Sequence, residues 1–516
     1  MAQKPNQLIA GFQPRLEWLA NNLDPNPAYR RFISDGNDIL TALEQAVERG
    51  EFFVGETKSI PGRRQWQNAL RDDRPSPIFL KWLYALFPDL LPAHFEAPTL
   101  AEFLHIGAEI QANRERWRPA IRYFAEHRTE LAITAKEYYR EVDESAELNF
   151  GGIMFPLLAQ RGWIRRVPLR LDEASEAQYL KFPEPGRSFK RLCLDGLKGD
   201  YVAYKGALAY ATRKVVRPEP QHNGEIFCAK HVLQDDFGFV GFSYYLARYF
   251  SYINTCELLG AELADWVVSH RDNDSPPPLS FRGKPSAAFD LENRAAYPGV
   301  NCLTIFLNYS ERKSLIGRGN YFLLHKRDET QLQAQNTVHI VPSGGHQGWA
   351  KGARAEDTAI WRTMMREFAE ELFDMEDLAK QPETWGDFQR HKDVARIKET
   401  FFGAINPAAR AYLHGFGLDP ITLKPEVLVS IVVDWEAAKK RWPDVRLKFN
   451  WELQSQDGTT RHQWERLSKD NLIVQARGGI QTIGSRDDTF LGTLPAGAAC
   501  MMEVARHYEY LGLPAG

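Results

Sequence analysis

The chain contains 516 residues, of which 44% are hydrophobic and 25% are charged, and its formal net charge at pH 7 is −3. This composition is typical of a folded protein of roughly two to four domains, and it excludes a disordered chain and a polycationic nucleic-acid-binding protein. The five cysteines lack Cys-x-x-Cys spacing, which argues against a zinc ribbon or a disulfide framework and favours a reducing compartment.

The first residues, Met1–Gln7, lack the apolar core of a signal peptide. No run of the sequence approaches the roughly 18 apolar residues of a membrane span. We therefore expect a cytoplasmic protein that makes no contact with a membrane, and any contact with nucleic acid must come from a local basic patch.

Residues 1–135 are expected to form a helical domain, because apolar residues recur at helical spacing in Asp38–Val47 and Phe79–Phe87. Between these runs, Ile60–Pro77 resembles the end of a helix-turn-helix of the Cro/repressor (XRE) type. The resemblance implies contacts with the major groove and the phosphates of DNA by Arg63, Arg64, Gln67, Arg71 and Arg74. A helical packing domain with an exposed basic edge is the alternative.

Residues 136–285 are expected to form a mixed, mainly helical middle domain that ends in a linker. Gly151–Leu158 is an apolar stretch, and Tyr244–Trp266 has the length of a long helix whose aromatic side chains pack a core. Pro276–Pro278 cannot continue a helix, so the domain boundary is expected near this segment.

Residues 286–516 show strand and helix patterns in alternation. Short apolar runs predict three strands, a pair of glycines predicts a tight turn, and apolar residues at helical spacing predict helices. In chain order, the expected elements are strands at Cys302–Tyr309, Tyr321–Arg327 and Val338–Val341, a turn at Gly344–Gly345, a helix from Glu356 to Asp374, and a terminal helix from Ala498 to Tyr510.

The helix expected at 356–374 carries an acidic face. Glu367, Glu370 and Glu371 stand at i, i+3 and i+4, so their carboxylates share one side, while apolar residues recur on the opposite side. Carboxylate oxygens suit Mg²⁺, which usually binds one or two carboxylates together with substrate phosphates. The alternative is a solvated surface helix in which Arg366 offsets the repulsion between the glutamates.

The stretch Arg366–Phe373 resembles the second half of the Nudix superfamily signature, Arg-Glu-U-x-Glu-Glu-x-Gly-U, where U is a bulky aliphatic residue. The charged positions of the signature are occupied by Arg366, Glu367, Glu370 and Glu371. Phe368 stands at the bulky position, and Phe373 replaces the closing glycine. From Gly345 the interval to Arg366 is 366 − 345 = 21 residues, which is longer than in the signature, so the loop carries an insertion.

The resemblance implies a Nudix-like α/β/α sandwich with a mixed sheet at 286–516, so the whole chain is expected to be an α+β protein. It also implies that the protein binds and hydrolyses a nucleoside-diphosphate-linked metabolite with Mg²⁺ or Mn²⁺. The expected metal ligands are Glu367, Glu370 and Glu371, and the expected ligand-binding residues are Arg327, Gly344, Gly345, His346 and Arg366.

A general base must stand within hydrogen-bond reach of the attacking water. Later carboxylates such as Glu426, Glu436 and Glu452 are candidates. We select Glu452, which lies in Leu447–Leu453, a run whose alternation predicts a strand. The expected catalytic set is then Glu370, Glu371 and Glu452. An outward-facing strand glutamate without a catalytic role is the alternative for Glu452.

Two other functions stay open. Phe237–Leu263 and His414–Glu426 resemble segments of long bacterial regulators that carry a helix-turn-helix ahead of a Nudix-like domain. Such a regulator would bind the metabolite without turnover and change its affinity for DNA. A partner-binding protein with a decayed pyrophosphatase fold is the third class. The expected partners are a nucleotide-derived small molecule, DNA in the regulator case, and a second copy of the chain in a homodimer.

Overall fold

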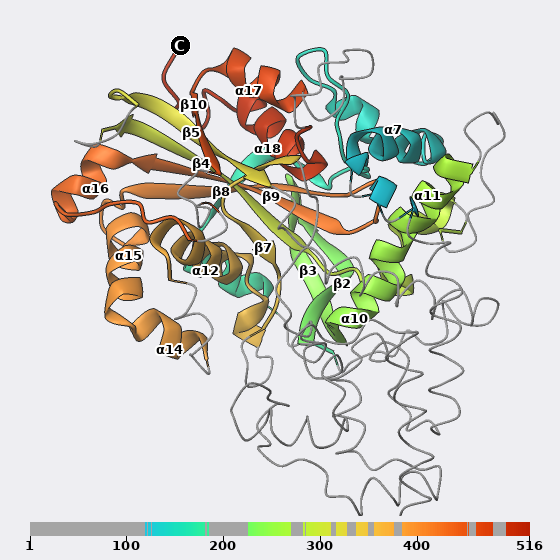
Figure 1. The fold of residues 1–516 in the computed structure, drawn as a ribbon. Coiled ribbons are helices and arrows are strands. Elements are labelled where there is room, and N and C mark those ends of the chain that lie inside the picture. The colour runs from blue at the N-terminus through green and yellow to red at the C-terminus, as the bar shows by residue number, and fades with distance from the viewer. Residues whose placement is uncertain are drawn as a thin grey trace, which may run out of the picture. The chain divides into compact units, whose positions relative to one another are not determined.

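The computed structural model describes residues 119–180, 183–184, 225–269, 282–310, 316–327, 337–348, 355–375, 384–450, 453, 461–477 and 492–515, apart from single positions at 121, 125 and 284 (Figure 1). The chain divides into two compact units, one comprising Phe124–Leu192 with Asn223–Gly516 and the other Met1–Tyr123 with Cys193–His222. Almost all of the second unit lies outside the described residues, and so does the expected helix-turn-helix.

A mixed sheet forms the centre of the described unit. Its strands are β1 (Ile164–Leu171), β4 (Gly299–Tyr309), β5 (Gly319–Arg327), β6 (Thr337–Ile340), β7 (Ser343–Gly345), β8 (Ala409–Leu418), β9 (Pro425–Asp434) and β10 (His462–Arg466). The order is β1–β8–β9–β4–β5–β10, while β6 pairs with β5 and β7 pairs with β4. Among the described pairs, β4 and β9 run parallel and the others run antiparallel.

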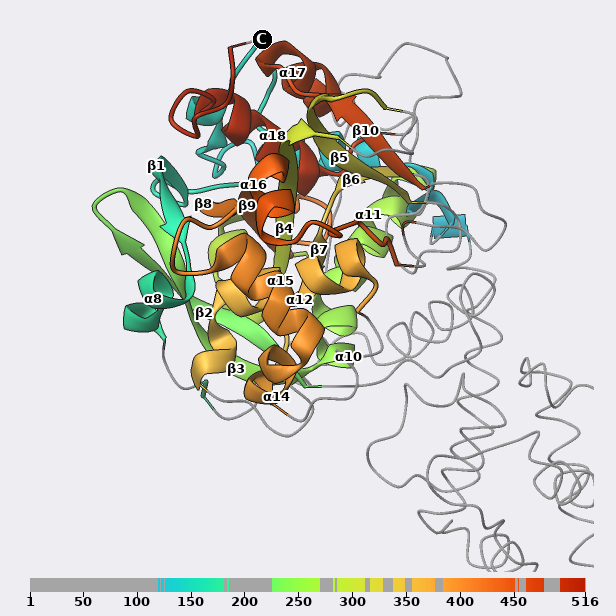
Figure 2. The same ribbon diagram turned by 90° about the vertical axis from the view of Figure 1, so that its left-hand side faces the viewer.

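Helices cover the sheet on both sides. The helices of the described unit are α7 (Arg128–Tyr138), α8 (Glu173–Glu176), α10 (Tyr249–Tyr252), α11 (Leu258–Ser269), α12 (Ile360–Phe373), α14 (Trp385–Arg390), α15 (Lys392–Phe402), α16 (Trp435–Arg441), α17 (Lys469–Arg477) and α18 (Pro495–Arg506). Figures 1 and 2 show α17 and α18 on one side of the sheet and α12, α14 and α15 on the other. The expected α+β architecture with a mixed sheet and flanking helices is therefore confirmed.

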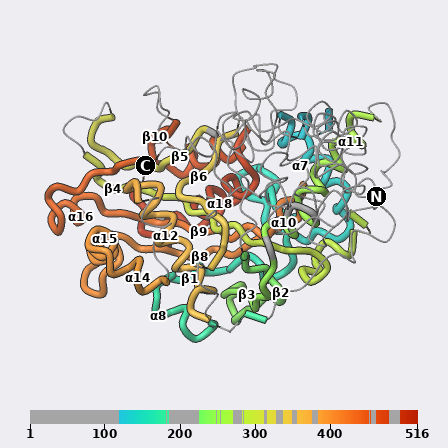
Figure 3. The backbone as a smooth tube through the Cα atoms, turned by 60° about the horizontal axis from the view of Figure 1, so that its bottom comes forward, coloured from blue at the N-terminus to red at the C-terminus, as the bar shows by residue number. Residues whose placement is uncertain are grey.

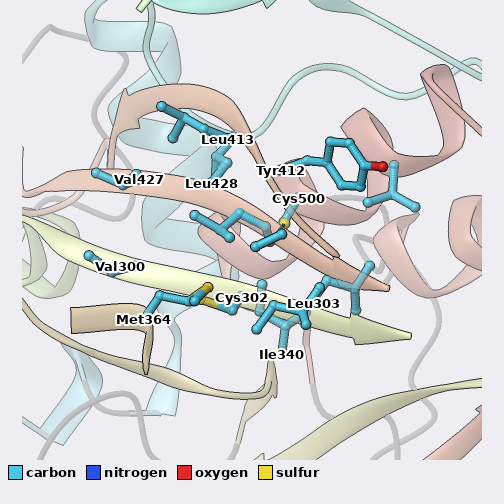
Figure 4. Close-up of a cluster of buried hydrophobic side chains, with 14 of the residues drawn as sticks. Val300, Cys302, Leu303, Ile340, Met364, Tyr412, Leu413, Val427, Leu428 and Cys500 are labelled. Carbon is cyan, nitrogen blue, oxygen red and sulfur yellow. Dashed lines mark hydrogen bonds between the residues drawn. The ribbon is translucent and has the colours of Figure 1, made fainter. Parts of the chain in front are cut away.

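The central strands are apolar along most of their length because both of their faces are covered. In β9, Leu428, Val429 and Ile431 are completely buried. Figure 4 shows how the two helical layers meet the sheet, with Met364 of α12 and Cys500 of α18 packed among strand side chains. No helix among the described residues is long and apolar enough to cross a bilayer.

The region expected as a mainly helical middle domain contributes three strands. β1 joins the main sheet through β8, and β2 (Glu225–Asp235) pairs with β3 (Gly238–Arg248) in a separate hairpin. Figure 3 shows this hairpin close to α10. The described residues of 136–285 and of 286–516 belong to one compact unit.

The long helix expected at Tyr244–Trp266 is wrong in its first part. Tyr244 and Tyr245 lie in β3, where Tyr245 is opposite Cys228 of β2, and the helical segment begins at Tyr249. Aromatic residues favour a pleated surface on which they pack against a partner strand, and this preference prevails over the helical pattern. The aromatic side chains do pack a core, as expected, because Tyr244 and Tyr245 are buried.

The strand expected at Leu447–Leu453 is also wrong for its described residues. Residues 447–450 form only an isolated bridge between Lys448 and Phe373, and Glu452 lies outside the described residues. The backbone N–H groups of Lys448 and Asn450 donate to the carbonyls of Leu372 and Glu371 at 2.9 and 3.2 Å. The last carbonyls of a helix lack partners within it, so this extended segment satisfies the end of α12.

Phe368 tests how strongly the apolar face of α12 holds the helix to the fold. Its side chain is completely buried and contacts Phe373, Phe401 and Phe402, with ring centroids 5.2 to 5.7 Å apart. The substitution Phe368→Ala removes this packing and leaves a cavity, so we expect the free energy of unfolding to fall by about 3–5 kcal/mol. Urea denaturation measures the change, and a loss below about 1 kcal/mol would contradict this packing.

Candidate functional site

The acidic face of α12 is buried rather than solvated. Arg366, Glu367 and Glu371 are 7%, 8% and 4% exposed, and the side chain of Glu370 is 17% exposed. The alternative of a solvated surface helix is therefore wrong. Charged side chains are rarely buried without a partner, so the arrangement around each of these four residues decides what the face can do.

Arg366 joins two of the glutamates. Its Nη2 lies 2.5 Å from Oε1 of Glu367, and its Nε lies 3.5 Å from Oε1 of Glu370. Nη2 also donates to the carbonyl of Gly345 at 3.0 Å, which ties α12 to β7. Burial opposes the charged form, but the attraction of Glu367 and Glu370 prevails and raises the pKa of the guanidinium above its ordinary value. Arg366 therefore stays charged.

The expected glycine turn is strand β7, which pairs antiparallel with the start of β4 so that Gly344 stands opposite Val300 and Gly345 opposite Gly299. A Cβ atom at Gly344 would overlap the carboxylate of Glu367, and one at Gly345 would overlap the hydroxyl of Tyr297. These glycines therefore let the strand backbone lie directly against the functional groups of its neighbours.

Glu371 is held by the same strand. Its Oε1 accepts a hydrogen bond from the backbone N–H of Ser343 at 3.0 Å. The charged face of α12 thus meets β7 at three successive residues, through Glu371 at Ser343, Glu367 at Gly344 and Arg366 at Gly345. The structure brings together Gly344, Gly345, Arg366, Glu367 and Glu371 from the expected site, with Glu370 joined through Arg366.

His346 follows β7 and lies beneath the first turns of α12. Its side chain is completely buried, and its Nδ1 lies 2.7 Å from the hydroxyl of Thr363. Burial, together with the positive charge of Arg366, lowers the pKa of the imidazole to about 3, so His346 is neutral at physiological pH. The structure gives this expected ligand-binding residue a role in holding α12.

The remaining expected site residues have side chains outside the described part of the structure. Arg327 is the last residue of β5, where its backbone is opposite Thr337 of β6, and its side chain is outside the described part of the structure. Glu452 lies outside the described residues altogether, as do the five side chains expected to bind DNA. Their roles stay predictions.

Two residues that border the cluster have no local sequence pattern that indicates them. Tyr297 fills the space above Gly345, and burial raises the pKa of its hydroxyl well above the ordinary value. Glu176 reaches α12 from a distant part of the chain. Glu426, one of the carboxylates considered as a general base, lies at the start of the apolar strand β9. It accepts from Asn301 at 2.8 Å and pairs with Lys424 at 3.1 Å.

The carboxylate oxygens at α12 are donors of the kind that a hard cation takes. Among the residues that the structure describes, no group of three or more His, Cys, Asp or Glu side chains is arranged to hold a metal ion. Mg²⁺, however, usually binds only one or two carboxylates and takes its other ligands from water and substrate phosphates. Glu367 and Glu370 both reach the guanidinium of Arg366, so their carboxylates already converge on one cation.

The chain was also compared with known proteins. No family model and no curated protein matches it.

Gly344 tests the close approach of β7 to α12. We expect Gly344→Ala to lower the free energy of unfolding by about 1–3 kcal/mol, because the added methyl group overlaps the buried carboxylate of Glu367. Gly241→Ala in β3 is the matched control, since its Cβ would meet no atom within 4 Å. Thermal and urea unfolding measure both changes. Equal effects of the two substitutions would contradict the close approach.

Proposed function

We propose that the protein binds a nucleoside-diphosphate-linked metabolite together with Mg²⁺ where the charged face of α12 meets β7, and that it hydrolyses the pyrophosphate. The observation that carries the proposal is the burial of Arg366, Glu367 and Glu371 against β7. In this strand, positions 344 and 345 have no space for a Cβ atom and are occupied by glycine. The pKa of Arg366 is raised by its acidic neighbours, and such a perturbed charged group beside other buried charges marks a candidate functional site.

The sign of the charge favours this class of ligand. Glu367, Glu370 and Glu371 carry three negative charges and Arg366 one positive charge, so the formal sum is −2. An anionic site repels a bare diphosphate, but it attracts a divalent cation and the phosphates that accompany the cation. The resemblance of Arg366–Phe373 to the Nudix signature supports the same assignment.

Each residue has a role that follows from its contacts. Arg366 holds the carboxylates of Glu367 and Glu370 side by side, and Ser343 holds that of Glu371 through its backbone N–H. Glu367 and Glu370 would hold the cation, with Glu371 next to them on the helix. Bound Mg²⁺ would neutralise the pyrophosphate and lower the pKa of an attacking water. Glu452, which lies outside the described residues, is the proposed general base on the sequence alone.

The proposal is tested by incubating the purified protein with Mg²⁺ and a panel of nucleoside-diphosphate-linked compounds. We expect product release to fall by about 100-fold in Glu370→Gln and in Glu371→Gln, because each change removes a charged oxygen ligand or its neighbour. Glu436→Gln is the control, since Glu436 pairs with Arg318 at the surface and should leave release unchanged. Circular dichroism checks that each variant is folded.

The outcomes separate the candidate functions. Product release that depends on Glu370 and Glu371 supports hydrolysis. A rise in melting temperature with Mg²⁺ and one compound, without product release, would overturn hydrolysis and favour the metabolite-sensing regulator. Neither effect with any compound would overturn the proposal as a whole.

A further inference from the structure

The N-terminus of α12 is capped by a residue from a distant part of the chain. Ala359, which precedes the helix, offers no side-chain hydrogen bond. Instead, the carboxylate of Glu176 at the end of α8 accepts from the backbone N–H of Ile360 at 3.0 Å and from that of Trp361 at 2.6 Å. The two partners are 184 and 185 residues away along the sequence.

The cap made by Glu176 buries a carboxylate, which costs free energy that a solvent-exposed helix cap does not cost. Glu176 is only 4% exposed, and burying a carboxylate in place of water is strongly unfavourable unless it is well bonded. The positive end of the helix dipole and the two N–H groups favour the charged form, but burial prevails and raises the pKa to about 8. A serine at position 359 would cap the helix locally without burying a carboxylate.

Charged and titratable groups face Glu176 from three elements. Asp172 precedes α8, Arg362 lies in the first turn of α12, and the hydroxyl of Tyr244 approaches from β3. Asp172 opposes ionisation of Glu176, whereas Arg362 favours it. None of these groups belongs to the proposed metal site, so Glu176 can be changed without touching a ligand.

The contacts of Glu176 fix the position of α12 along its own axis. Arg366 and Glu367 follow Ile360 by six and seven residues, which is about 10 Å along a helix that rises about 1.5 Å per residue. A helix transmits a shift of its first turn to these residues. The overlap that a Cβ at Gly344 would make with Glu367 shows that this part of α12 has little space for a shift.

We propose that Glu176 is a positioning residue of the α12 site, which sets where Glu367 and Glu370 meet β7 and thereby sets the affinity for Mg²⁺. This inference rests on the proposed function. His346 also contacts the first turns of α12, through the hydroxyl of Thr363.

The experiment compares Glu176→Gln with wild type and with Asp434→Ala. Asp434 caps α16 through the N–H of Ala437 at 3.1 Å, so its loss removes a helix cap away from α12. We expect the Mg²⁺ concentration for half-maximal activity to rise about 10-fold in Glu176→Gln, with the rate at saturating Mg²⁺ within about 2-fold of wild type. Asp434→Ala should leave both quantities unchanged. Glu176→Asp is a second variant in case Glu176→Gln does not fold.

The pH dependence gives a readout that loss of stability alone would not change. When α12 opens, Glu176 returns from a pKa of about 8 towards its ordinary value of 4.5, so the closed state holds a proton that the open state releases. Protection is therefore complete below about pH 4.5 and is lost as the pH rises through about 8. Hydrogen exchange of a peptide covering 360–367, corrected for intrinsic rates, should show this loss in wild type but not in Glu176→Gln.

The results distinguish the two proposals. A wild-type protein that has no response to Mg²⁺ would overturn the proposed function. The other case is a wild-type protein that responds to Mg²⁺. If Glu176→Gln then has the same half-saturating Mg²⁺ concentration and the same pH dependence of exchange as wild type, the positioning role alone is overturned.

Discussion

The contact between the charged face of α12 and the glycine strand β7 is the constraint on which the candidate site depends. Arg366, Glu367 and Glu371 are removed from water there, and each is compensated by a neighbour on the helix or by the backbone of β7. Because buried charges are costly when a partner is lost, small changes in the distance between α12 and β7 should have large effects. The positions of the charged groups in the site therefore depend on the contact between α12 and β7.

The surrounding fold holds α12 at both ends as well as in the middle. Glu176 binds the first two N–H groups, and the N–H groups of Lys448 and Asn450 bind carbonyls in the last turn. The helix ends at Asp374, which has a left-handed backbone with φ of 56°. A non-glycine residue in this conformation ends the helix directly after Phe373.

The sequence predicted those parts of the structure that depend on local patterns. Strands β4, β5 and β6, helix α12 and the acidic face followed from apolar periodicity, and the paired glycines indicated a close approach of the backbone. It did not predict that Tyr244 and Tyr245 lie in a strand, because aromatic residues suit a helix core and a strand equally well without knowledge of the partner. Contacts such as those of Glu176 with Ile360 and of Asn450 with Glu371 join residues far apart in sequence, and no local pattern indicates them.

The most direct test of the central claim is an anomalous diffraction map from crystals grown with Mn²⁺ and a non-hydrolysable nucleoside diphosphate analogue. The account predicts a peak bound by the carboxylates of Glu367 and Glu370, with the diphosphate completing its coordination and Arg366 still in contact with β7. Diphosphate and metal bound elsewhere, or no peak beside α12, would contradict the account.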